Sequence, residues 1–125
     1  MITSFLLVYQ IENLPDFDIE FLEFFLSNEY FLITFFTLSL TGVVNGQNLI
    51  DGTNGLSSFT SLVVFINLIY LSIIVNDTTA FEKSLFLIFS LSIFILFNYP
   101  FGKIFLGDTG SYFIGLISGL YVIEI

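Results

Sequence analysis

Long apolar runs without a polar face constrain this chain more than any other feature of its sequence. Four of them, at 31–48, 57–75, 79–98 and 111–125, approach the about 20 residues that a helix needs to cross a bilayer. A small soluble domain must show polar residues along one side of each helix, because it cannot bury every helix completely. The sequence therefore predicts an all-α fold, a multi-pass transmembrane helical bundle with about four spans.

Composition agrees with a membrane environment and limits the possible ligands. The 125 residues are 56% hydrophobic and 10% charged, whereas soluble domains average roughly 25% charged residues. Cysteine and histidine are absent from the sequence, so any bound metal must be held by oxygen atoms. The formal net charge of −9 repels polyanions, and it predicts no nucleic-acid partner.

The N-terminal region differs from the four spans. Residues 1–11 are apolar but too few for a span, so we interpret them as a partial helix whose beginning is missing. Residues 12–30 contain six acids and Pro15, which predicts an exposed outer loop. We therefore expect one membrane domain over residues 1–125, incomplete as it stands.

Alternating spans would divide the connecting segments between the two sides of the membrane. Segments 49–56 and 99–110, both containing Gly and Asp, fall on the side opposite to residues 12–30. Lys83 and Lys103 fall on opposite sides, so the positive charge of the loops does not orient the chain. We expect the two Gly- and Asp-containing segments to face the same compartment.

The segment NGQNLIDGTNGL carries polar side chains at the end of the first span. Asn45, Asn48 and Asp51 are spaced by three, which places them on roughly one face of a helix end. Gly52 and Gly55 allow backbone turns and the close approach of a ligand. Such a segment can present oxygen atoms to a cation, although an ordinary Asx and Gly turn after a helix would give the same pattern.

A second segment, NYPFGKIFLGDTGS, leads into the last span. Asp108 lies just before a predicted helix, where backbone N–H groups and the helix dipole favour phosphate. A carboxylate beside an anion is unfavourable unless a cation lies between them, and Mg²⁺ is bound in this way by carboxylates and phosphate oxygens. Asp108 is therefore the best candidate metal ligand, with a helix N-cap as the alternative. Because both segments share one side, we expect a single composite site.

Both segments resemble signature loops of a known enzyme family. NGQNLIDGTNGLS and NYPFGKIFLGDTGSYFIG are similar to two motifs of the polyprenyl-phosphate N-acetylhexosamine-1-phosphate transferases, glycosyl transferase family 4. This family includes the phospho-N-acetylmuramoyl-pentapeptide transferases and the N-acetylglucosamine-1-phosphate transferases. Asn54 stands where the muramoyl-pentapeptide branch usually carries an Asp, so the motif sequences look closer to those of the polysaccharide-initiating branch.

The resemblance implies roles for the acidic and amide side chains near the metal. Asn48 and Asp108 match positions that hold the catalytic Mg²⁺, with Mn²⁺ as a possible replacement. Asp51 matches a polar position beside the metal, so Asp51 and Asp108 are the expected catalytic residues. The metal would neutralise the charge of a pyrophosphate group, which is the usual contribution of the protein site to phosphoryl transfer.

The resemblance also implies nucleotide contacts. Asn54 matches a position that contacts the base, Phe105 matches an aromatic that stacks on uracil, and Asn98 matches a polar position lining the site. Lys103 lies where a cation could meet pyrophosphate. A lipid-facing ring for Phe105 and a snorkelling anchor for Lys103 are the structural alternatives.

The activity implied by the resemblance is transfer of an N-acetylhexosamine-1-phosphate, or a related sugar-1-phosphate, from a UDP-sugar to polyprenyl phosphate, with release of UMP. Such enzymes serve cell-envelope polysaccharide or peptidoglycan precursor synthesis. The expected location is the bacterial inner membrane, with segments 49–56 and 99–110 in the cytoplasm, where UDP-sugars are supplied.

Two features of the family have no counterpart in the sequence. The family carries an earlier pair of adjacent Asp residues and a later loop with basic and His residues, whereas this chain has no adjacent acids and no His. We therefore expect a fragment that does not catalyse transfer alone. A transporter or channel segment with broken helices and an inactive gene remnant are the alternative interpretations.

Overall fold

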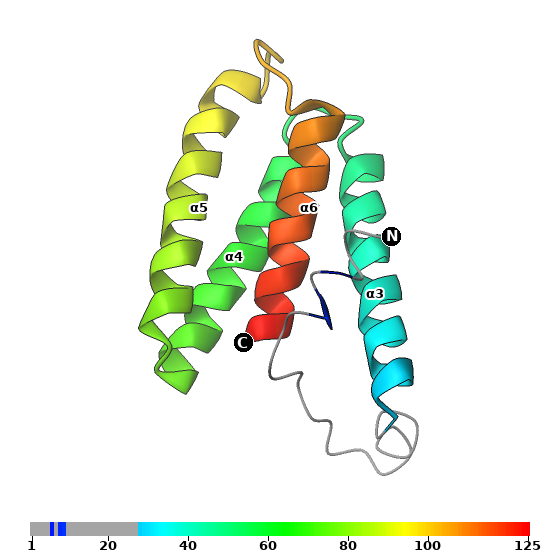
Figure 1. Cartoon of the computed structure of the whole chain (residues 1–125). Coiled ribbons are helices and arrows are strands. Elements are labelled where there is room, and N and C mark those ends of the chain that lie inside the picture. The colour runs from blue at the N-terminus through cyan, green and yellow to red at the C-terminus, as the bar shows by residue number, and fades with distance from the viewer. Residues whose placement is uncertain (1–5, 7, 10–27) are drawn as a thin grey trace.

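The computed structural model describes residues 6, 8, 9 and 28–125, and its long elements are all helices (Figure 1). No strand lies within 28–125, so the predicted all-α fold is confirmed there. Most of the predicted partial helix at 1–11 and of the outer loop at 12–30 lies outside the described residues. The helices are α3 (Glu29–Ile50), α4 (Leu56–Val75), α5 (Thr78–Asn98) and α6 (Gly107–Glu124).

Two helices of the described part of the chain, α4 and α5, are long and apolar enough to cross a membrane. At about 1.5 Å per residue, their 20 and 21 residues match a hydrocarbon core of about 30 Å. Their outer sides carry large exposed apolar side chains such as Ile66, Phe86 and Leu96. Such surfaces suit lipid rather than water. Helix α3 (22 residues) and helix α6 (18 residues) are less apolar on average than α4 and α5.

The helix boundaries lie close to the predicted spans except at the start of α6. This helix begins at Gly107 rather than at residue 111, so Asp108 lies in its first turn and not in the preceding loop. Gly107 has a positive φ of 66°, which lets the chain turn into the helix. The N-cap is Leu106, so the N-cap alternative for Asp108 is wrong. A carboxylate in the first turn is still favoured by the helix dipole.

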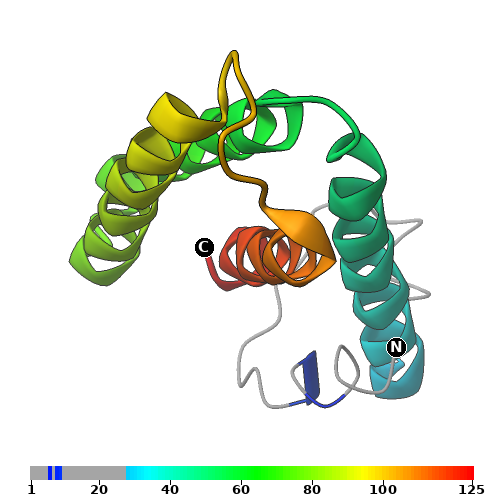
Figure 2. The ribbon, with the colours of Figure 1, turned by 90° about the horizontal axis from the view of Figure 1, so that it is seen from above.

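Helix α6 connects two parts of the bundle. Helix α3 packs along α6, α4 packs along α5, and α6 also contacts α4. Seen from above, α6 lies between α3 and the α4–α5 pair (Figure 2). Buried clusters centred on Leu40 and Phe65 fill the two contact regions, and α6 contributes Ile123 to the first and Ile114 to the second. The position of α6 therefore decides how the two motif segments face each other.

Small residues let α6 approach α3 closely. A Cβ atom on Gly115 would lie 2.9 Å from the Cβ of Gln47 and 3.0 Å from the Cα of Val44. A Cβ atom on Gly119, one turn further along, would collide with the side chain of Leu40. Small residues four apart are a common device for close contact between membrane helices. The antiparallel pairing brings the beginning of α6 to the end of α3.

Candidate functional site

Hydrogen bonds join the end of α3 to the first turns of α6. The Ser111 hydroxyl lies within donating distance of Asn48 Oδ1 (2.6 Å) and of the Asp108 backbone oxygen (3.0 Å). Asn48 Nδ2 donates to the Tyr112 hydroxyl at 3.2 Å. Ser111 is fully buried, whereas Asp108 is exposed. Asn48 and Asp108, from two distant segments, therefore lie at the same end of the bundle.

Asp51 and Asp108 bring two carboxylates to this end of the bundle. Burial raises the pKa of Asp51 above its ordinary value, a hydrogen bond with Ser57 lowers it, and the negative charge of Asp108 raises it further. Asp51 lies just beyond the last residue of α3, where it is partly buried. A cation between the two carboxylates would offset this repulsion.

The donor atoms fit a magnesium site that is completed by its ligand. Among the described residues, no three Asp, Glu, His or Cys side chains gather in one place. The available donors are the carboxylates of Asp51 and Asp108 and the amide oxygen of Asn48. Mg²⁺ is usually held by one or two carboxylates, with water and phosphate oxygens in the remaining positions. The residues present are thus compatible with this ion.

The two motif loops touch each other directly. Asn54 Nδ2 donates to the backbone oxygen of Pro100 at 3.2 Å. A Cβ atom on Gly102, whose φ is 59°, would lie 2.9 Å from Asn54 Nδ2. The rings of Phe59 and Tyr99 meet edge to face with centroids 5.5 Å apart. The segment after α3 and the segment before α6 therefore form one connected surface.

The remaining candidate residues fall into two groups. Asn98 is buried, and its Nδ2 donates to the Ile104 backbone oxygen at 2.7 Å while its own backbone oxygen accepts from Gly102 at 2.7 Å. It shapes the loop from within. Phe105 is 73% exposed and Lys103 is also exposed. These two side chains are accessible to a ligand, whereas Asn98 reaches one only through the loop that it supports.

Sequence reasoning missed Gln47, which is only 9% exposed. Its Nε2 lies within donating distance of the Ser57 backbone oxygen (3.0 Å), of Ser57 Oγ (2.7 Å) and of Ser61 Oγ (2.7 Å). A glutamine in a largely apolar helix, with serines 10 and 14 residues later in the next one, was the available signal. Ser111 and Tyr112 were also missed as partners of Asn48.

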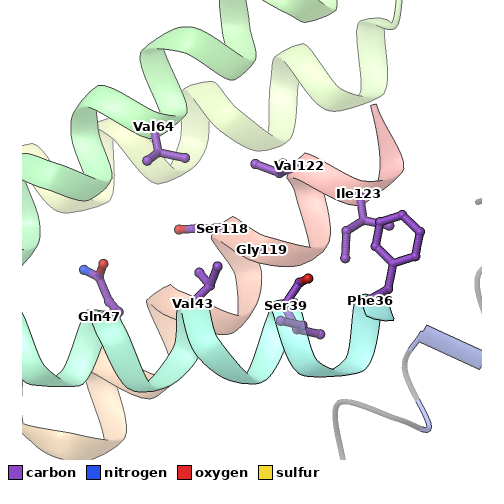
Figure 3. A pocket seen from close by; sticks show the side chains of 10 residues that line it. Phe36, Ser39, Val43, Gln47, Val64, Ser118, Gly119, Val122 and Ile123 are labelled. Carbon is purple, nitrogen blue, oxygen red and sulfur yellow. The ribbon is translucent and has the colours of Figure 1, made fainter. Parts of the chain in front are cut away.

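A pocket of about 300 Å³ lies among α3, α4 and α6, further along the helices than the motif loops. Its lining is largely apolar, with Phe36 and Val43 from α3, Val64 from α4 and Val122 from α6 (Figure 3). Gln47 is among the polar side chains in its wall. The apolar lining does not suit a nucleotide.

The fold and the site together define an all-helical membrane protein with a cluster of oxygen donors at one end. The sequence profile of "Glycosyl transferase family 4" matches residues 1–125, so this chain belongs to that family. The resemblance inferred from the two motifs is thereby confirmed. Membership also favours a transferase over the transporter or channel alternative.

Named relatives carry several transferase activities. A phospho-N-acetylmuramoyl-pentapeptide-transferase of Leuconostoc mesenteroides is 38% identical over 86 residues, which cover 69% of this chain and 26% of the relative. A putative UDP-N-acetylglucosamine–dolichyl-phosphate N-acetylglucosaminephosphotransferase of Saccharolobus solfataricus is 39% identical over 93 residues, 72% of this chain and 28% of the relative. A probable undecaprenyl-phosphate N-acetylglucosaminyl 1-phosphate transferase of Bacillus subtilis is 35% identical over 78 residues, 62% of this chain and 22% of the relative.

The matched region is a limited part of each relative. The chain spans about a quarter of the length of these proteins. No solved structure matches the chain. The relatives belong to both branches of the family that the motifs resemble, so the assignment to the polysaccharide-initiating branch stays a prediction.

Proposed function

We propose that this chain supplies the metal-binding and nucleotide-binding part of an enzyme that transfers a sugar-1-phosphate from a UDP-sugar to polyprenyl phosphate and releases UMP. Family membership and the names of the relatives support the reaction class. The single observation that carries the site is the meeting of Asn48, Asp51 and Asp108 at the junction of α3 and α6.

In this proposal, Asn48, Asp51 and Asp108 hold one divalent cation, Mg²⁺ or Mn²⁺. The ion supplies neutralisation of the pyrophosphate charge when it is bound. The first turn of α6 faces the same place, and its backbone N–H groups favour phosphate oxygens. Asp51 and Asp108 are the proposed catalytic residues, because their carboxylates would hold this cation beside the phosphate groups.

The nucleotide would lie over the two touching loops. Phe105 offers an exposed ring for stacking on uracil, and Asn54 offers an amide at the contact between the loops. Lys103 is exposed on the same loop as Phe105 and supplies a positive charge for a phosphate group. Asn98 contributes by holding this loop in shape.

The proposed setting is a multi-pass protein of the bacterial inner membrane with both motif loops in the cytoplasm. Alternating spans and the cytoplasmic supply of UDP-sugars support this orientation. It is tested by labelling single cysteines at position 53 and at position 77, which lie at opposite ends of α4. We expect a membrane-impermeant thiol reagent added outside intact cells to modify position 77 and not position 53, and the reverse pattern would contradict the orientation.

The central test of the proposed function is UDP binding by the 125-residue chain in detergent micelles with Mn²⁺. We expect binding that depends on Mn²⁺ and weakens about tenfold or more in Asp108→Asn, because a charged ligand oxygen is lost. Asp77→Asn is the matched control, since it makes the same change at the other end of the bundle and Asn caps helices about as well as Asp. Equal affinities of Asp108→Asn and the wild type would contradict the proposed site.

Transfer itself gives a second measurement. Because the family's paired acids and its His-containing loop have no counterpart in this sequence, we expect the chain alone to release no UMP from a UDP-N-acetylhexosamine in the presence of polyprenyl phosphate and Mg²⁺. UMP release above a blank would show that the chemistry lies within these 125 residues.

A further inference from the structure

We propose that Gln47 is a positioning residue, whose buried amide holds the turn between α3 and α4 so that Asn48 and Asp51 face the first turn of α6. This inference rests on the proposed function, because it concerns the placement of the same donor atoms. Gln47 itself is buried and contacts α4 and α6.

The amide of Gln47 binds the first turns of α4. Its Nε2 approaches the backbone oxygen of Ser57 and the hydroxyl oxygens of Ser57 and Ser61, and all three distances are 3.0 Å or less. Both serines are 1% exposed. In such surroundings a polar group without a partner is unfavourable, so the amide and its acceptors fix each other's direction.

The contact continues from Ser57 to the carboxylate of Asp51. Ser57 Oγ accepts from Gln47 Nε2 and is hydrogen-bonded to Asp51. Because a hydroxyl has a single hydrogen, accepting from Gln47 leaves that hydrogen for Asp51. The amide therefore orients a hydroxyl, and the hydroxyl orients the carboxylate.

Helix α6 holds Gln47 from the other side. Gly115 has no Cβ, and one placed there would lie 2.9 Å from the Cβ of Gln47. Gly115 follows Asp108 by seven residues, about two helical turns along the same helix. Gln47 is thus in contact with both helices whose ends flank the site, and Asn48 is its neighbour in the chain.

An apolar residue of similar size would pack in this position, but it would form no hydrogen bond to orient the turn between α3 and α4. Interhelical hydrogen bonds in membranes add only modest stability on average. What the amide adds is the alignment of one specific turn. We therefore expect Gln47→Met to keep the helices while loosening the turn and weakening the site.

The first measurement follows the turn without relying on any ligand. Because the sequence has no cysteine, spin labels at Thr53→Cys and Thr109→Cys report the separation of the α3–α4 turn and the first turn of α6. We expect Gln47→Met to broaden the distance distribution. Asn67→Leu is the control, because the Asn67 amide is exposed on α4 and donates within its own helix to Val63.

The second measurement is Mn²⁺ affinity in the presence of UDP. Gln47→Met should weaken it about fivefold, the change expected when a neutral hydrogen bond is lost, whereas Asn67→Leu should leave it unchanged. Ser61→Ala removes one acceptor and should give a smaller loss. The Gln47→Met, Ser61→Ala double variant should bind no more weakly than Gln47→Met alone, because both changes break the same contact.

The outcomes separate the two proposals. A wild-type chain that binds no Mn²⁺ counts against the proposed function. In that case the spin-label distances alone test whether Gln47 positions the turn. Binding that is lost in Asp108→Asn but unaltered in Gln47→Met, together with an unaltered distance distribution, overturns the role of Gln47. If Gln47→Met loses its helical circular dichroism, the Ser61→Ala variant tests the proposal in its place. A distance distribution and an Mn²⁺ affinity of Ser61→Ala that equal those of the wild type would overturn the proposal.

Discussion

The two ends of the bundle use the same residue types for different purposes. At the α4–α5 turn, Asn76 adopts a left-handed conformation, and Asp77 caps α5 by accepting from the N–H groups of Thr79 (2.9 Å) and Ala80 (3.0 Å). At the motif end, Asp108 does not cap α6, since the N-cap is Leu106, and its negative charge helps to raise the pKa of Asp51. Asp77 uses Oδ1 for both hydrogen bonds to its own helix, whereas the side chain of Asp108 caps no helix and is exposed.

This comparison shows why a single short motif is poor evidence of a site. An Asn-Asp pair occurs at the α4–α5 turn and a Gly-Asp pair at the motif end, and either is compatible with an ordinary turn. The motif end differs because a second segment, distant in sequence, brings another carboxylate and an amide to the same place. The close contact of α6 with α3 makes that meeting possible.

The largest expected effect therefore concerns the packing of α6 on α3. Gly115→Val should destabilise the chain by about 1–3 kcal/mol, because the added atoms meet Gln47 and the backbone of Val44. Gly42→Ala is the control, since nothing lies within 4 Å of a Cβ there. It should be neutral or stabilise the helix by up to about 1 kcal/mol. Thermal unfolding in micelles measures both, and equal melting temperatures would mean that the two helices do not pack closely.

An intermediate effect distinguishes the two aspartates directly. Asp77→Ala should lower stability by about 1 kcal/mol, because the first N–H groups of α5 lose their acceptor. Asp108→Ala should lower it far less, since its carboxylate caps no helix. Chemical unfolding followed by helical circular dichroism compares them. A greater loss for Asp108→Ala would show that this residue supports the fold and would weaken the comparison.

The helices were predictable from sequence because the bilayer leaves few choices for a long apolar run. The start of α6 was not, since Gly107 and Gly110 are characteristic of loops, whereas the structure has this segment already in the helix, next to the contact of Ser111 with Asn48. Tertiary contacts override local propensity in such cases.

The candidate site was predictable in part. The spacing of Asn48 and Asp51 identified the face that meets α6, but Gln47 lies off that face, and its partners on α4 follow from packing. For Asn98, sequence gives no means of telling an amide that lines a site from one that closes its own loop at Ile104. Both distinctions depend on the direction of a side chain, which spacing alone does not specify.

The smallest expected effect has the opposite sign from the loss of the Asp77 cap. In the metal-free chain, Asp51→Asn should raise stability slightly, by roughly 0.2–0.5 kcal/mol, the size typical of a partly exposed charge pair. The cause is that burial and the charge of Asp108 both disfavour the Asp51 carboxylate, and the amide has no charge to desolvate or repel. Mn²⁺ should reverse the order, because a ligand that binds only the folded chain stabilises it in proportion to its affinity, and the Asn variant has one fewer anionic ligand. Thermal unfolding of the wild type and the variant, with a chelator and then with saturating Mn²⁺, measures both signs. If Asp51→Asn lowers stability without metal, Asp51 supports the fold as Asp77 does, and the two ends of the bundle are alike.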